Sequence, residues 1–154
     1  MKIIIVFAGL LIFLGSCSCH TDKTKSLVEM EIRSTGGYDV YVIKVYADST
    51  IYCISGEGEI GRDYYDTIYA AKSVQLGSSQ MKDVINALDK VKTHYKKSRS
   101  EKPIMKDTWE YFFYIEGKLY HMNIRDMNSD KSFNYLFELL KELSPIPIEL
   151  RGFA

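Results

Sequence analysis

Apolar and charged side chains alternate without interruption over residues 28–33. Successive side chains of an extended chain point to opposite faces, so this order makes one apolar face and one charged face. The apolar positions are Val28, Met30 and Ile32, and the charged positions are Glu29, Glu31 and Arg33. The segment therefore predicts a half-buried strand, whose apolar face other elements must cover.

Three further strands are predicted in the first half of the chain. Residues 38–46 follow two glycines and are rich in Val, Ile and Tyr on both parities, which favours a strand that is central or covered on both faces. Residues 50–55 are predicted to form its hairpin partner after a turn near Asp48 and Ser49. Another strand, over roughly residues 67–76, follows a polar loop.

A hairpin is predicted in the second half of the chain. Its strands span residues 109–115 and 119–125, and Glu116, Gly117 and Lys118 stand between them. Glycine supplies the unusual backbone angle that a tight hairpin turn needs. The two strands should therefore pair with each other and run antiparallel.

Two segments show the three- and four-residue spacing of an amphipathic helix. The first is predicted to begin at Ser78 or Ser79 and to run to about Lys96, and the second to begin at Asn128 or Ser129. Prolines at positions 145 and 147 prevent the second helix from continuing. The predicted core positions are Met81, Val84, Ile85, Leu88, Val91, Phe133, Leu136, Phe137, Leu140 and Leu143.

The order of these elements is strands, a helix, a hairpin and a helix, with residues 146–154 predicted as a last edge strand. This order favours a single α+β domain over residues 27–154. We expect a mainly antiparallel sheet of about five to seven strands, with two amphipathic helices packed on one face.

The N-terminus has the pattern of an export signal. Residues 3–14 follow a lysine and contain no charge and a single glycine. This run is shorter than the about 20 apolar residues that cross a bilayer as a helix, and small residues follow it. We therefore expect residues 1–16 to be removed. Residues 17–26 are polar and without periodicity, which predicts a flexible tether.

The signal ends in Leu14, Gly15, Ser16 and Cys17, a series that resembles the lipobox of bacterial lipoproteins. The resemblance implies cleavage before Cys17, lipid on its thiol and the membrane as a partner. Ser18 after the cysteine implies release to the outer membrane, and the absence of an acidic run after it implies the periplasmic face. The alternative is an ordinary secretory signal, with Cys17 as a bystander.

Charge and cysteine content limit the other partners. The chain has 20 basic and 20 acidic residues, so no strong field attracts nucleic acid, and we expect no nucleic-acid partner. The three cysteines are too few for a disulfide scaffold. If Cys17 carries lipid, Cys19 and Cys53 can form a disulfide; alternatively, Cys53 is a small buried residue of a strand.

Two motif-like segments do not satisfy the chemistry that they suggest. Residues 56–61 match the dinucleotide-binding spacing G-x-G-x-x-G, but the residues that follow lead towards a strand instead of a helix, and Glu57 and Glu59 would repel phosphate. Residues 17–20 read Cys-Ser-Cys-His, with one residue between the cysteines where c-type haem attachment needs two. We therefore predict no cofactor.

The histidines do not form a recognisable catalytic or metal-binding pattern. His94 lies near the end of the first predicted helix, and His121 lies on the polar parity of the hairpin. No serine elbow or reactive-cysteine context accompanies either of them, so both are interpreted as structural or solvated. We predict no catalytic residue and no metal site.

Aromatic residues are concentrated in residues 109–114, where large rings fall on both faces of one strand. If helices cover Tyr111, Phe113 and Ile115, then Phe112 and Tyr114 form a patch on the opposite face. Exposed aromatic patches commonly bind a protein or a sugar. The alternative is that the C-terminal tail or neighbouring strands bury both rings.

The layout of residues 27–150, with a Tyr-rich antiparallel sheet and helices, resembles that of small lipoproteins of Bacteroides-type bacteria. The resemblance implies a location in the cell envelope. The hypothesis that follows is a non-catalytic binding module that holds an envelope protein. The alternative is an enzyme or carrier acting on an envelope glycan or lipid, which predicts a concave pocket with titratable groups of shifted pKa.

Replacing Cys17 with Ser tests the lipid anchor. We expect Cys17→Ser to abolish membrane retention and to leave the signal uncut, because the hydroxyl does not replace the thiol that carries the lipid. Fractionation of cells expressing the full chain, with mass analysis of the N-terminus, measures both effects. Continued membrane retention with normal signal removal would contradict the lipoprotein interpretation.

Overall fold

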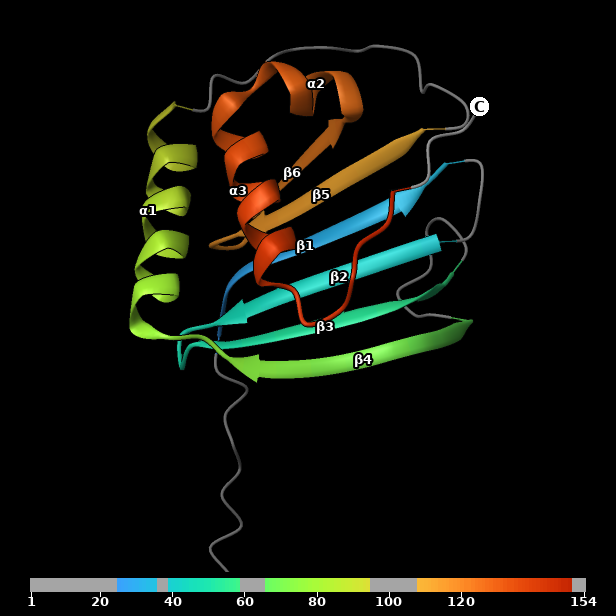
Figure 1. Cartoon of the computed structure of the whole chain (residues 1–154). Coiled ribbons are helices and arrows are strands. Elements are labelled where there is room, and N and C mark those ends of the chain that lie inside the picture. Colours follow the sequence, from blue (N-terminus) through green and yellow to red (C-terminus); the bar gives the residue numbers. More distant parts are fainter. Residues whose placement is uncertain (1–24, 36–38, 59–65, 95–107, 151–154) are drawn as a thin grey trace, which may run out of the picture.

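The computed structural model describes residues 25–35, 39–58, 66–94 and 108–150. It shows an α+β fold in which helices pack against a six-stranded antiparallel sheet, as the sequence predicts (Figure 1). The elements are β1 (Ser26–Ser34), β2 (Asp39–Tyr46), β3 (Thr50–Glu57), β4 (Thr67–Gln75), α1 (Ser78–His94), β5 (Trp109–Ile115), β6 (Lys118–Asn123), α2 (Ile124–Ser129) and α3 (Lys131–Leu143).

The strands follow the order β4-β3-β2-β1-β5-β6, and every neighbouring pair is antiparallel. β1 thus lies in the interior of the sheet, between a meander from the first half of the chain and a hairpin from the second. The β5–β6 turn places Glu116 and Gly117 at positive φ, 51° and 78°. These are the angles of a two-residue hairpin turn whose twist matches the strands, so the predicted hairpin is confirmed.

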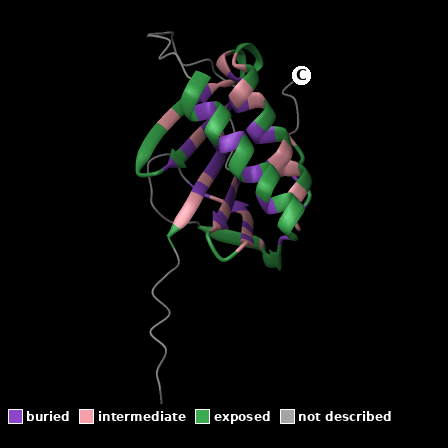
Figure 2. Cartoon of the chain, turned by 90° about the vertical axis from the view of Figure 1, so that its left-hand side faces the viewer, coloured by how far each residue is buried: buried purple, intermediate pink, exposed green. Residues whose placement is uncertain are grey.

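Helices α1 and α3 cover one face of the sheet (Figure 1). The helix-facing sides of β1 and β5 are buried, and β5 contributes aromatic rings to this core. The Phe113 ring lies 5.0 Å from that of Phe133, and the Tyr111 ring meets Phe137 edge to face at 5.2 Å. Figure 2 shows the buried residues as stripes along the helices, which is how an amphipathic helix fits a sheet.

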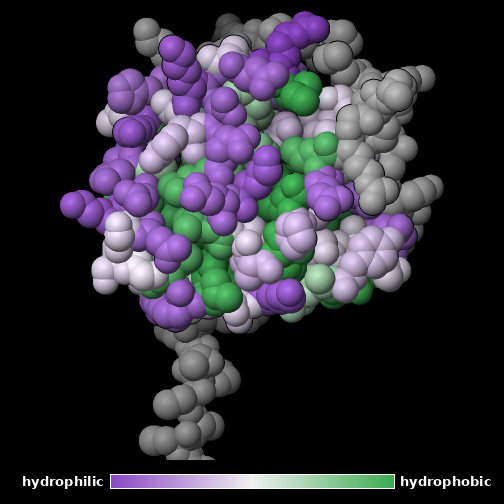
Figure 3. Space-filling model, viewed as in Figure 1, coloured by the Kyte–Doolittle hydropathy of each residue, from purple (hydrophilic) through white to green (hydrophobic). Residues whose placement is uncertain are grey.

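The outer surfaces of the helices are mostly hydrophilic, with apolar side chains visible between them (Figure 3). Most predicted helical core positions are buried, but Ile85 is 45% exposed and Leu143 is only half-buried. Ile85 has the correct spacing for the apolar stripe of α1 yet lies at its edge. Three- and four-residue spacing alone therefore predicts an apolar stripe on α1 that is wider than the part buried against the sheet.

The region between β6 and α3 differs from the prediction. β6 ends at Asn123 instead of residue 125, because the Asn123 side chain accepts a hydrogen bond from Asp126 N and starts the short helix α2. The second amphipathic helix begins at Lys131, and not at Asn128 or Ser129. Its N-cap is Asp130, whose carboxylate accepts hydrogen bonds from two backbone amides of the first turn.

The predicted edge strand over residues 146–154 is wrong for its described part, residues 146–150, which contains no strand. Ile146 and Ile148 are instead buried against the core. The Ser144 hydroxyl lies 2.6 Å from the Ile146 carbonyl oxygen and fixes the start of this segment. Pro147 removes a backbone donor, so apolar burial, and not strand pairing, holds the tail.

We expect Asp130→Ala to lower the free energy of unfolding by about 1 kcal/mol, because it removes the acceptor for two amides at the start of α3. Asp130→Asn keeps a side-chain oxygen at this position and is the matched control. Urea denaturation followed by circular dichroism measures both. Equal loss of stability in the two variants would show that the cap does not act through its acceptor oxygen.

Candidate interaction surface

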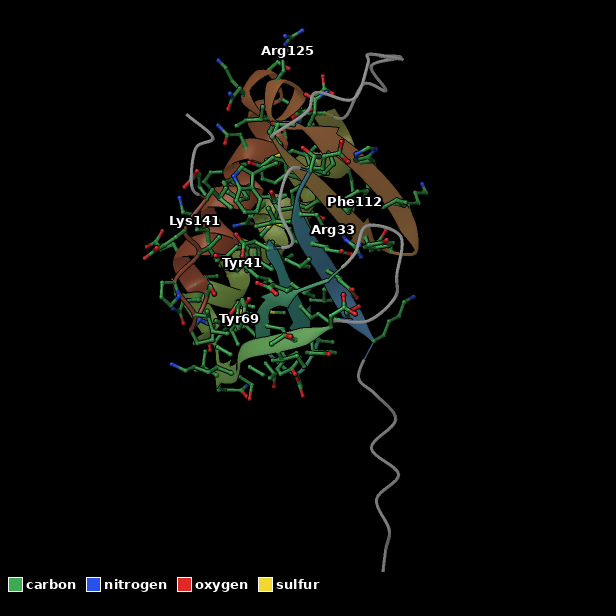
Figure 4. The ribbon with its side chains drawn as sticks, turned by 90° about the vertical axis from the view of Figure 1, so that its right-hand side faces the viewer. Arg33, Tyr41, Tyr69, Phe112, Arg125 and Lys141 are labelled. Atoms are coloured by element: carbon green, nitrogen blue, oxygen red, sulfur yellow. The ribbon has the colours of Figure 1, made fainter. Side chains whose placement is uncertain are left out.

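The face of the sheet opposite α1 and α3 carries no helix among the described residues. Figure 4 shows Phe112 and Arg33 on this side of the sheet, away from the helices. We call it the open face. It exists because β1 and β5 each have a second set of side chains, the alternate positions to those that form the core.

The strand register arranges the side chains of the open face in three rows that cross the sheet from β4 to β6. The first row is Ser73, Tyr52, Lys44, Glu29, Tyr114 and Leu119. The second row is Ala71, Ile54, Val42, Glu31, Phe112 and His121. The third row is Ile68, Gly56, Val40, Arg33, Glu110 and Asn123.

Charged side chains on the open face form ion pairs with one another. Lys44 Nζ lies 2.9 Å from the Glu29 carboxylate on the neighbouring strand. Arg33 pairs with Glu31, two residues before it on the same side of β1. A partner docking on this face therefore meets charges that are already compensated within the domain.

Exposed apolar side chains of the open face lie side by side on β5 and β6, and another, Ile68, lies on β4 and is 56% exposed. Tyr114 is 39% exposed and lies directly opposite Leu119, which is 55% exposed. In the next row Phe112 is half-buried and stacks on the His121 ring, with centroids 4.5 Å apart and planes 3° from parallel. Val40 and Val42, on β2, are by contrast buried.

His121 also pairs with Glu110, its Nε2 lying 2.8 Å from a carboxylate oxygen. The contact holds the imidazole flat against Phe112, so ring and carboxylate form one unit on the surface. We name Phe112, Tyr114, Leu119 and His121 the aromatic patch. It combines an apolar area with a polar rim, the composition that protein-binding surfaces favour.

The sequence predicted the placement of Phe112 and Tyr114 on the face away from the helices, but not their neighbours. His121 was interpreted as structural or solvated, and Leu119 was not singled out. The signal for both lies in the turn: a two-residue turn at Glu116 and Gly117 fixes which residues of the hairpin stand opposite each other. Counting outward from that turn gives both pairs.

A groove of about 490 Å³ lies on the other side of the sheet, between β2–β4 and the C-terminal segment. Its lining includes Asp39, Tyr41, Tyr69 and Glu149. The pKa of Tyr69 is raised to about 12, first by its hydrogen bond to Glu57, then by desolvation and by the charges of Glu57 and Asp39. The Tyr69 hydroxyl is thus a hydrogen-bonding group beside a carboxylate.

A second groove of about 330 Å³ lies between α1 and α3. Its polar lining is acidic, with Asp83, Glu138 and Glu142, and Tyr135 stands beside them. This arrangement can hold a polar or cationic group.

Cys53 lies in the core, on the helix-facing side of β3, and is bonded to no other cysteine among the described residues. Burial raises its pKa to about 11, and a hydrogen bond from the Ser144 hydroxyl, 3.3 Å away, partly opposes this shift. A thiol with such a pKa is a poor nucleophile at neutral pH. Cys19 lies outside the described residues, so the disulfide with Cys53 stays a prediction.

The other positions singled out in the sequence have separate outcomes. Leu14, Gly15, Ser16 and Cys17 lie outside the described residues, so lipidation and cleavage stay predictions. His94 is the last residue of α1, and its Nδ1 lies 2.9 Å from a carbonyl oxygen one turn earlier. Gly56 lies within β3, and the next described element in the chain is strand β4.

The described part of the chain contains no group of three His, Cys, Asp or Glu side chains placed to hold a metal ion. Nor does any helix within it have the length and apolarity needed to cross a membrane. No protein-family model matches the chain, and comparison with curated proteins found no significant match.

We expect Cys53 to react slowly with iodoacetamide at pH 8 in the folded protein, because its buried thiol stays protonated below a pKa of about 11. The rate should rise many-fold in denaturing urea. A Cys19→Ala background removes the competing thiol on the tether, and mass spectrometry of the Cys53 peptide measures the rate. Fast labelling without urea would contradict the packing of β3.

Proposed function

We propose that the chain is a membrane-anchored, non-catalytic binding module that holds a protein of the bacterial cell envelope. The observation that carries the proposal is the aromatic patch of the open face. Tyr114 and Leu119 are large apolar side chains with about two fifths or more of their surface exposed, and they stand side by side. Phe112 and His121 extend the same area into the next row.

The chemistry of this face favours a protein as the partner. Aromatic side chains are over-represented among the residues that contribute most to protein binding, and they act best when surrounded by a polar rim. The Lys44–Glu29 and His121–Glu110 pairs supply such a rim. Since these charges are paired within the domain, the affinity should come from the apolar contact more than from net charge.

The position of the patch supports a partner close to the membrane. β1 begins at Ser26, which stands opposite Tyr46 at the end of β2. The same end of the sheet holds the β5–β6 turn, because Val28 stands opposite Ile115. Tyr114 and Leu119 directly flank this turn. If lipid on Cys17 anchors the chain at the periplasmic face of the outer membrane, the patch lies at the anchored end.

The alternative, an enzyme or carrier for an envelope glycan or lipid, is favoured by one observation, the groove beside the C-terminal segment. It has the volume of a small-ligand site and two tyrosines in its lining. The raised pKa of Tyr69 matches the expectation of titratable groups with shifted pKa, but it describes a hydrogen-bonding phenol. This groove therefore supports ligand binding more than catalysis.

Affinity capture tests the protein-binding proposal. The full chain, carrying a C-terminal tag and its own signal, is expressed in the source cells, and the envelope is solubilised in mild detergent. We expect one envelope protein to be recovered in near-equal amount. Tyr114→Ala and Phe112→Ala should each reduce this recovery at least about tenfold. Truncating a central aromatic residue of an interface commonly costs about 2 kcal/mol of binding free energy.

Tyr135→Ala is the matched control, since Tyr135 is 44% exposed but lies on α3, on the other side of the molecule. Recovery should be unchanged in this variant. Equal loss in the control and the patch variants would show a general effect on folding. Recovery that none of the three substitutions changes would remove the aromatic patch as the binding surface.

A further inference from the structure

The two edges of the sheet differ in how they are protected. β4 is an edge strand of nine residues that, within the described part of the chain, pairs with β3 alone, and it carries a single charged residue, Lys72. Every residue of β4 except Ala70 is exposed. Long edge strands with few charges are templates for pairing with another chain, because one side of their backbone has unmet hydrogen-bonding groups.

The opposite edge, β6, is shorter and less available. It has six residues, begins with Lys118 and leads directly into α2 at Ile124. Short strands, charges and an adjoining helix are the usual means of preventing edge pairing. The contrast singles out β4. Figure 1 shows that neither α1 nor α3 extends beyond β4, so the approach along this edge is free of helices.

The backbone groups of β4 that face outward can be identified from its register. Leu76 N donates to Ser49 O, towards β3. Since the backbone groups of a strand alternate in direction, the N–H and C=O groups of Ala71, Ser73 and Gln75 point away from β3. These three residues lie in the regular part of the strand, beyond the irregularity at Ser55 and Gly56 of β3.

From this arrangement we infer that β4 pairs with β4 of a second copy of the chain, antiparallel and about a two-fold axis at Ser73. Ser73 then stands opposite Ser73 of the partner subunit, and both exchange backbone hydrogen bonds. The axis is perpendicular to the sheet, so it joins the two sheets into one and keeps the helices of both copies on the same face.

Charge favours a second copy as the occupant of this edge. In the Ser73 register each Lys72 stands opposite Val74 of the partner subunit, so its aliphatic stem covers an exposed apolar side chain. A register shifted to place the axis at Lys72 would instead bring two ammonium groups face to face, which is destabilising. The chain has a formal net charge of zero, so two copies do not repel each other at a distance.

The proposed pairing also closes on itself. It uses β4 of both copies and leaves β6, the protected edge, at each end of the joined sheet. A contact between β4 of one copy and β6 of the next would instead continue without limit and produce a filament. The inference does not depend on the aromatic patch, which lies on strands at the other edge and stays accessible in the dimer.

Cysteine cross-linking tests the register. In cells expressing the full chain with Cys19→Ala, Ser73→Cys should give a disulfide-linked dimer on mild oxidation, because opposed residues of antiparallel strands have Cα atoms within disulfide range. Ala71→Cys is the matched control on the same face of the same strand. In the proposed register the two Ala71 positions are about 13 Å apart, so this variant should remain monomeric under oxidation.

Non-reducing electrophoresis measures the dimer fraction. A dimer at position 73 at least about fivefold more abundant than at position 71 supports the inference. Equal dimer at both positions indicates random collision and overturns it, as does the absence of dimer at position 73, the result expected if another protein's strand occupied the edge.

A second variant tests the hydrogen bonds themselves. Proline is tolerated on an edge strand where the lost N–H points outward, so Ser73→Pro should leave the fold intact, as checked by circular dichroism. Light scattering of the full chain in detergent should give the mass of two chains, and Ser73→Pro should reduce it to one. A single-chain mass without the substitution overturns the inference.

Discussion

The sheet depends on β1, whose neighbours come from different halves of the chain. It pairs with β2 on one side and with β5 on the other, so it joins the β2–β4 meander to the β5–β6 hairpin. Its alternating sequence directs one set of side chains into the core and the other set to the open face. The same residue pattern thus sets both the apolar contact with the helices and the paired charges opposite them.

Most of the architecture could be predicted because it rests on local signals. Alternation predicted β1, and the turn at Glu116 and Gly117 predicted the hairpin. Helix α2 was missed because its start depends on one side-chain hydrogen bond of Asn123, within a segment that otherwise continues the strand pattern. The tail after Ser144 was predicted as an edge strand, but its described part is held by the burial of Ile146 and Ile148 against the core.

The candidate surface was predictable only in part, for a similar reason. Alternation alone places Phe112 and Tyr114 on one face. The stacking of Phe112 on His121 needs the register between two strands, and the pairing of Lys44 with Glu29 needs the order of strands in the sheet. The groove beside Tyr69 is harder to predict, because it forms between β2–β4 and residues near the C-terminus, which are far apart in the sequence. No single segment of the sequence contains it.

The position of β1 also has a consequence for the order of folding. Among the described elements β1 is synthesised first, yet one of its two neighbours, β5, follows only after three further strands and α1. Contacts between residues so far apart in the chain form slowly, since a long loop must close before they contribute. Until β5 is made, the side of β1 that later pairs with it has no neighbouring strand. An unpaired strand edge can pair with another chain, so a nascent chain that is kept apart from other chains aggregates less during this interval.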